Sequence, residues 1–106
     1  MSKVDWFTQD LADEADKCGE DDDKRQRLLS AVAATTTWIT HNQLLGSTEL
    51  VKNFNIPGLR YKKVISDGEF DYLAFYVIES TGIARMSRLV WSDSDFASKI
   101  RMAEGK

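Results

Sequence analysis

The stretch that decides the fold of this chain runs from Arg60 to Ser92 and reads RYKKVISDGEFDYLAFYVIESTGIARMSRLVWS. Three runs rich in β-branched and aromatic residues alternate there with two turn signals, which is the pattern of successive strands. We therefore predict strands over Arg60–Ile65, Phe70–Glu79 and Ile83–Ser92. Because the connections between them are short, the strands should pair in chain order as an antiparallel meander.

The dipeptide Asp67-Gly68 predicts the register of the first hairpin. It favours a two-residue type I′ turn, in which both central residues have positive φ. A three-residue loop over Ser80–Gly82 would set the register of the second hairpin. The expected cross-strand pairs are Lys63 with Tyr72, Tyr61 with Ala74, Tyr76 with Met86, Ala74 with Arg88, and Tyr72 with Val90.

This register sorts the side chains onto two faces of the sheet. One face has an apolar centre, and we expect the helices to pack on it: Leu73, Phe75, Val77 and Leu89. The other face gathers tyrosines, a methionine and two bases, residue types that are enriched at the centres of protein interfaces. Its candidate partner-binding members are Tyr61, Lys63, Tyr72, Tyr76, Met86 and Arg88. Two alternatives stay open, namely that both faces are covered or that the two faces are exchanged.

Helical patterns flank the strands on both sides. The spacing of apolar residues predicts an amphipathic helix over Val4–Lys17 and a long helix over Lys24–Leu45, with Asp23 as the N-cap of the second. The β-branched run Thr35–Thr37 is a point where the long helix could bend or end. A short helix from Ser47 or Thr48 to Phe54 and a C-terminal helix over Phe96–Met102 complete the prediction.

These elements predict one α+β domain over residues 1–106. Its N-terminal helices should pack on one face of a three-stranded antiparallel β-meander, with a short C-terminal helix after the sheet. The 42% hydrophobic and 29% charged content is that of an ordinary soluble globule. We expect no membrane partner, because the sequence has no apolar run of about 18 residues. The single Cys18 and the absence of a secretory signal favour the cytoplasm, or the cytosol of a host cell.

The net charge of −3 conceals a strong asymmetry along the chain. Residues 1–23 carry nine acids against Lys3 and Lys17, whereas residues 24–106 carry twelve bases against eight acids. An acidic helix can steer a basic partner and can imitate the phosphate charge of a nucleic acid. The candidate partner-binding acids on that helix are Asp10, Asp13, Glu14 and Asp16. The alternative is that this charge run only forms a solvated face.

No residue pattern indicates catalysis or a cofactor. His41 is the only histidine, and no cysteine or second histidine lies near it in sequence to complete a metal site. Cys18 precedes Gly19 at the expected C-terminal end of a helix, which is not the environment that activates a thiol. We therefore expect no catalytic, cofactor-binding or metal-ligating residues.

Nucleic-acid binding is the alternative function. Residues 24–63 carry seven bases against Glu49 alone, and the order helix, Gly46, helix and hairpin resembles that of a winged helix-turn-helix. The tyrosines on the sheet could also stack nucleobases. Against this, the helix expected to read a groove carries a single base, Lys52.

A non-catalytic protein-binding module is the function that the sequence favours. Inhibitors, immunity proteins and regulators of virus, phage or plasmid origin belong to this class. The expected partner is a protein, with a basic nucleic-acid-binding protein or a second copy of the chain as specific candidates.

Overall fold

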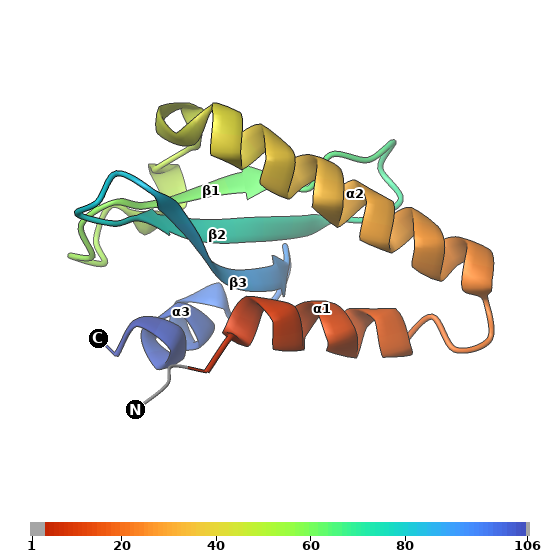
Figure 1. The fold of residues 1–106 in the computed structure, drawn as a ribbon. Coiled ribbons are helices and arrows are strands. Elements are labelled where there is room, and N and C mark those ends of the chain that lie inside the picture. The colour runs from red at the N-terminus through yellow and green to blue at the C-terminus, as the bar shows by residue number, and fades with distance from the viewer. Residues whose placement is uncertain (1–3, 106) are drawn as a thin grey trace.

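The computed structural model describes residues 4–105, and these fold as α+β (Figure 1). The elements in chain order are α1 (Trp6–Asp16), α2 (Asp22–His41), the 3-10 turns η1 (Gln43–Leu45) and η2 (Glu49–Val51), β1 (Leu59–Lys63), β2 (Tyr72–Ile78), β3 (Ala84–Trp91) and α3 (Phe96–Glu104). The strands form one antiparallel sheet in the order β1-β2-β3. The predicted fold class is therefore confirmed. None of the helices in the described part of the chain is long and apolar enough to cross a membrane.

Both long helices begin at an aspartate that caps them. Asp5 accepts a hydrogen bond from the Thr8 amide, and Asp21 accepts one from the Lys24 amide. A carboxylate at this position satisfies a backbone N–H that the first helical turn leaves without a partner. The N-cap of α2 is thus Asp21 rather than the predicted Asp23, because Asp23 already lies inside the helix.

The threonine run in α2 does not end the helix. The Thr35 hydroxyl donates to the Ala31 carbonyl one turn earlier and accepts a hydrogen bond from the Ile65 amide, so its polar group is satisfied although the residue is fully buried. The helix therefore continues to His41. Beyond Gly46 the predicted short helix reduces to the 3-10 turn η2.

The tight turn predicted at Asp67-Gly68 is wrong. Gly68 has φ +90°, but Asn55 is the only non-glycine with positive φ in the described chain, so Asp67 lacks the conformation that a type I′ turn requires. Strands β1 and β2 instead end at Lys63 and begin at Tyr72, with a long loop between them. The loop is held on α2 by the hydrogen bond from Ile65 to Thr35.

This loop changes the register of the first hairpin by one residue. Tyr61 lies opposite Phe75 rather than Ala74, and Lys63 lies opposite Leu73 rather than Tyr72. Because side chains alternate between the two faces of a strand, the shift moves Tyr61 and Lys63 to the other face from the one predicted.

The second hairpin follows the predicted register only near its turn. Tyr76 pairs with Met86 as expected, but a β-bulge between Phe75 and Tyr76 shifts every later pair. Arg88 consequently lies opposite Phe75, not Ala74. The remaining observed pairs are Tyr72 with Trp91, Leu73 with Val90, and Ala74 with Leu89.

Both faces of the sheet are covered. Side chains of α1 and α2 pack on one face of the sheet, and Ile100 of α3 packs on the other. The core beneath α1 and α2 contains Phe7, Leu28, Val32, Ile39, Ala74, Tyr76 and Leu89. The second core contains Val51, Leu59, Leu73, Phe75, Val77, Val90 and Ile100. The prediction that the N-terminal helices pack on Leu73 and Phe75 is therefore wrong. They pack on the side of Ala74 and Tyr76 and the other side is covered too, so both alternatives apply.

Candidate protein-docking site

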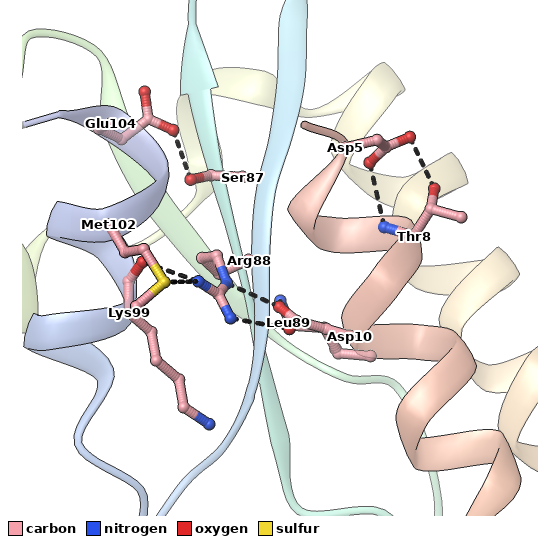
Figure 2. Close-up of polar contacts among 9 residues, drawn as sticks. All are labelled: Asp5, Thr8, Asp10, Ser87, Arg88, Leu89, Lys99, Met102 and Glu104. Carbon is pink, nitrogen blue, oxygen red and sulfur yellow. Dashed lines mark hydrogen bonds and ion pairs between the residues drawn. The ribbon is translucent and has the colours of Figure 1, made fainter. Parts of the chain in front are cut away.

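Helix α1 is attached to the edge of the sheet by a nearly buried ion pair. Both carboxylate oxygens of Asp10 accept hydrogen bonds from the Arg88 guanidinium at 2.8 Å, and one of them also accepts the Leu89 amide at 3.0 Å. The guanidinium lies 4.7 Å from the centroid of the Trp6 ring and also donates to the Lys99 carbonyl of α3. Figure 2 shows Arg88 between α1 and α3. This pair fixes α1 in its place on β3.

One turn further along α1, Glu14 binds the sheet. Its carboxylate accepts hydrogen bonds from the Tyr72 hydroxyl at 2.6 Å and from the Lys17 ammonium at 2.9 Å. Partial burial raises the pKa of Glu14, but these two hydrogen bonds outweigh it and hold the pKa below its usual value. Burial and the hydrogen bond to Glu14 raise the pKa of Tyr72. Glu14 is therefore a charged residue with internal partners.

Between α1 and the end of β3 lies a groove of about 490 Å³. Its carboxylates come from α1, Tyr72, Arg88 and Trp91 come from the sheet, and Lys99 comes from α3. Its complete lining is Asp10, Asp13, Glu14, Lys17, Tyr72, Arg88, Leu89, Trp91, Ser94 and Lys99. Three acids and three bases make the groove nearly neutral. Trp91 is 51% exposed, so an aromatic surface is open to a partner here.

The excess negative charge lies beyond the groove, on the outer side of α1 and in the turn that joins it to α2. Asp16, Glu20 and Asp23 are exposed, and their carboxylates make no hydrogen bond or ion pair within residues 4–105. Asp13 borders the groove and is also exposed, and its carboxylate accepts a hydrogen bond only from the neutral side-chain amide of Gln9. Figure 1 shows this turn at one end of the molecule. The acids of α1 thus divide into an inner pair that holds the fold and an outer set that faces solvent.

The structure brings together half of the residues that the sequence selected for partner binding. Asp10, Asp13, Glu14, Tyr72 and Arg88 line one groove, and Asp16 lies exposed at the end of the same helix. Asp10 and Arg88, however, are each other's partners and have little access to solvent.

The other selected residues lie elsewhere. Tyr76 is fully buried beneath α2, where its hydroxyl donates to the Gln43 carbonyl, so the expectation of an exposed side chain is wrong there. Met86 packs against the same core. Tyr61 packs on Phe75 in the opposite core, with ring centroids 5.5 Å apart. Lys63 is exposed, and its ammonium lies 3.8 Å from Asp71. A continuous tyrosine face therefore does not exist in the folded chain.

Sequence reasoning missed Trp91 and Lys99 as groove residues. The predicted alternation placed Trp91 on the core face, and the β-bulge in β3 reverses that assignment. The signal available in the sequence was the position of Trp91 at the end of its strand, directly before the polar run Ser92–Asp95. Lys99 carried no signal, because its place in the groove depends on how α3 packs.

Most bases that suggested nucleic-acid binding have internal partners. They are Arg25 with Asp22, Arg27 with Glu69, Lys52 with Glu49, Arg60 with the Gly46 carbonyl, Lys62 with the Trp38 ring, and Lys63 with Asp71. Among the seven bases of residues 24–63, only Lys24 has a side chain that makes no hydrogen bond, ion pair or ring contact within residues 4–105. The structure thus offers no continuous free basic stripe of the kind that tracks a phosphate backbone.

Within residues 4–105, no three histidine, cysteine, aspartate or glutamate side chains converge as a metal-binding group would. His41 is exposed at the end of α2, with its Nδ1 2.9 Å from the Thr37 carbonyl. The Cys18 thiol points back to the Glu14 carbonyl, at 3.7 Å. Neither residue lies beside a group that would activate it.

Comparisons with protein-family models, with curated proteins and with solved structures found no match.

Proposed function

We propose that this chain is a small non-catalytic protein-binding module that docks on a basic surface of a protein partner. The observation that supports it is the division of the α1 acids described above. Asp10 and Glu14 hold the helix on the sheet, whereas Asp13 and Asp16 point to solvent beside the acidic turn. Acids that stabilise the fold need internal partners, and within residues 4–105 the outer acids Asp13, Asp16 and Glu20 form no ion pair.

A basic partner fits this surface for a physical reason. Several uncompensated charges of one sign at one end of a molecule create a field that accelerates association with the opposite charge. Repulsion among these acids costs folding free energy, and binding of a cationic surface relieves it. The spacing of carboxylates along a helix and turn can also imitate phosphates, so a basic nucleic-acid-binding protein is the partner class that fits best.

Trp91 supplies the apolar part of the surface. Charged residues at the rim of an interface chiefly set its association rate, while buried aromatic anchors carry most of the binding free energy. The half-exposed indole and Asp13 line the same groove, so one partner segment can meet both. Inhibitors, immunity proteins and regulators of virus, phage or plasmid origin act through surfaces of this kind.

The decisive experiment captures partners with three matched baits. The wild type is compared with Asp13→Lys/Asp16→Lys and with Glu49→Lys/Asp71→Lys, which makes the same change of charge on the far side of the sheet. The captured protein is identified by mass spectrometry, and its association rate is then measured at several salt concentrations. We expect the α1 variant to associate more slowly and with a weaker salt dependence, while the control variant behaves as the wild type.

Two outcomes would contradict this function. One is a captured protein that binds the α1 variant at the wild-type rate. The other is recovery of nucleic acid as the direct ligand, with an affinity that falls steeply with salt and with loss of Lys24 or Lys63. That result would establish the alternative function.

A further inference from the structure

Two neighbouring leucines stand out from the surface at the end of α2. Leu44 and Leu45 are 72% and 71% exposed, the highest values among the large hydrophobic residues of the described chain. They belong to the 3-10 turn η1, and Leu50 of η2 is also exposed. Single exposed apolar residues are common, but adjacent leucines at this exposure form a patch that needs an explanation. We call Leu44 and Leu45 the leucine prong.

Hydrogen bonds from the sheet hold the backbone on both sides of the leucine prong. The Tyr76 hydroxyl donates to the Gln43 carbonyl from below, the Arg60 guanidinium donates to the Gly46 carbonyl at 2.8 Å, and Ser47 pairs with Tyr61 at the edge of β1. Gly46 is in contact with Tyr76 and has no room for a side chain. A fixed apolar group binds with little loss of conformational entropy, which favours a role in association.

The neighbourhood of the prong is basic. Arg60 adjoins it through Gly46, and the Lys62 ammonium lies 4.5 Å from the ring centroid of Trp38 near the end of α2. Between residues 24 and 63 the only acid is Glu49, which is paired with Lys52. A complementary surface would offer an apolar hollow with acidic groups at its rim.

Such a surface exists at the other end of α2. A cleft of about 330 Å³ lies between the N-terminal half of α2 and the loop after β1, and we call it the α2 cleft. Ala31 and the buried Phe70 provide apolar surface in it, and the exposed charged residues of its lining are Asp67, Glu69 and Arg27, two acids against one base. Asp67 makes no hydrogen bond or ion pair within residues 4–105, and Glu69 is paired with Arg27. Asp21 and Asp23 add negative charge near Arg27.

We propose that copies of this chain associate head to tail, with the leucine prong of one copy in the α2 cleft of the next. The two surfaces cannot meet within one molecule, because Ala31 and His41 are separated by about 15 Å along a continuous helix. When two copies join in this way, the pair still has one free prong and one free cleft. Further copies can therefore add to form an open chain, unless the rotation between neighbouring copies closes a ring. Two leucine side chains supply only part of the roughly 800 Å² per partner that a stable interface buries, so we expect the association to be weak.

Sedimentation of complementary variants tests this arrangement, and it does not depend on the proposed function. Leu44→Asp/Leu45→Asp removes the prong and keeps the cleft, whereas Ser30→Arg at an exposed position blocks the cleft and keeps the prong. The matched control is Ile83→Asp, which removes another exposed hydrophobic residue at the β2–β3 turn. We expect the mean mass of the wild type and the control to rise with concentration, while each deficient variant remains monomeric.

The mixture of the two deficient variants provides the sharpest result. Only one productive contact remains possible there, so a mixed dimer should form and no larger species should follow. A wild type that stays monomeric to millimolar concentration would overturn the proposal. So would self-association that survives loss of the prong, or a mixture that remains monomeric while the wild type assembles.

Discussion

Asp10 and Arg88, 78 residues apart in the sequence, form the most enclosed ion pair among the described residues, with side chains that are 12% and 6% exposed. Each group has further partners. Asp10 accepts a hydrogen bond from the outward-facing amide of Leu89, and Arg88 donates a hydrogen bond to the Lys99 carbonyl of α3. The pair therefore joins α1, the edge strand β3 and α3. It also occupies a backbone amide at the sheet edge that would otherwise be open to pairing with another chain.

Removing one charge of this pair should be far more costly than removing both. Asp10→Asn leaves the guanidinium buried without a counter-charge, and we expect a loss of about 3–5 kcal/mol in the free energy of unfolding. The double variant Asp10→Leu/Arg88→Met removes both charges and should lose much less, because apolar side chains of similar size need no desolvation of charge. Urea melts of the single and double variants measure the difference. Equal losses would mean that the pair acts only through packing.

The hydrogen bond between Tyr72 and Glu14 should make stability depend on pH. The pKa of Glu14 is lowered in the folded chain, so the stabilisation is present above the unfolded value of about 4.3 and is lost as the pH falls through the folded pKa. Tyr72→Phe removes the donor and should cost about 1.5–3 kcal/mol at neutral pH. The gap between variant and wild type should close in acid. Chemical denaturation at a series of pH values tests this, and a gap that is constant down to pH 3 would contradict it.

The fold class followed from local patterns, but the register did not. Strand runs, helix periodicity and capping aspartates are properties of neighbouring residues, and they predicted the order of elements correctly. Asp67-Gly68 had the composition of a tight turn, yet Ile65 of the same loop donates its amide to Thr35 of α2. That contact spans 30 residues of sequence. Tertiary packing thus overrode local turn chemistry, and one residue of slip exchanged the face of Tyr61.

The candidate site was predictable to a similar degree. Residue types typical of interfaces led to Tyr72 and to the α1 acids, which share a groove. Composition could not reveal that Arg88 would form an ion pair with Asp10, because the pair forms only when α1 packs on β3. Nor could it reveal that Tyr76 would be covered by α2 while Trp91 remained open, since the β-bulge decides that outcome.

Phe75 should be essential to the second core. The side chain is fully buried, with the Tyr61 and Phe96 rings at 5.5 and 5.6 Å between centroids. Phe75→Ala should lower the free energy of unfolding by about 3–5 kcal/mol, through lost apolar burial and an unfilled cavity. Ile83→Ala, at an exposed turn position, serves as the control and should change it by less than about 0.5 kcal/mol. Thermal or urea melts decide between them.

Gly46 should be intolerant of a side chain for steric reasons alone. Its φ of −64° is accessible to any residue, but an added Cβ would lie 2.0 Å from the Tyr76 hydroxyl oxygen. Gly46→Ala should therefore cost about 1–3 kcal/mol, the usual penalty of overpacking. Tyr76→Leu in the same chain removes the clashing ring, so the double variant should lose less than the two single losses added together. Additive losses would show that Tyr76 does not cause the strain.

Truncation of Tyr76 and of Trp91 should have opposite effects on folding and on partner binding. Tyr76 is fully buried and hydrogen-bonded to Gln43, so Tyr76→Ala should lower the melting temperature sharply. Trp91 is half exposed at the groove, so Trp91→Ala should leave the melting temperature nearly unchanged. If the groove receives a partner, the same change should weaken binding of the captured protein by about 2 kcal/mol or more, because interface centres concentrate binding free energy in aromatic residues. Calorimetric titration with folded variants measures both effects. Wild-type affinity in Trp91→Ala would remove the groove from the interface and leave the acidic turn as the remaining docking surface.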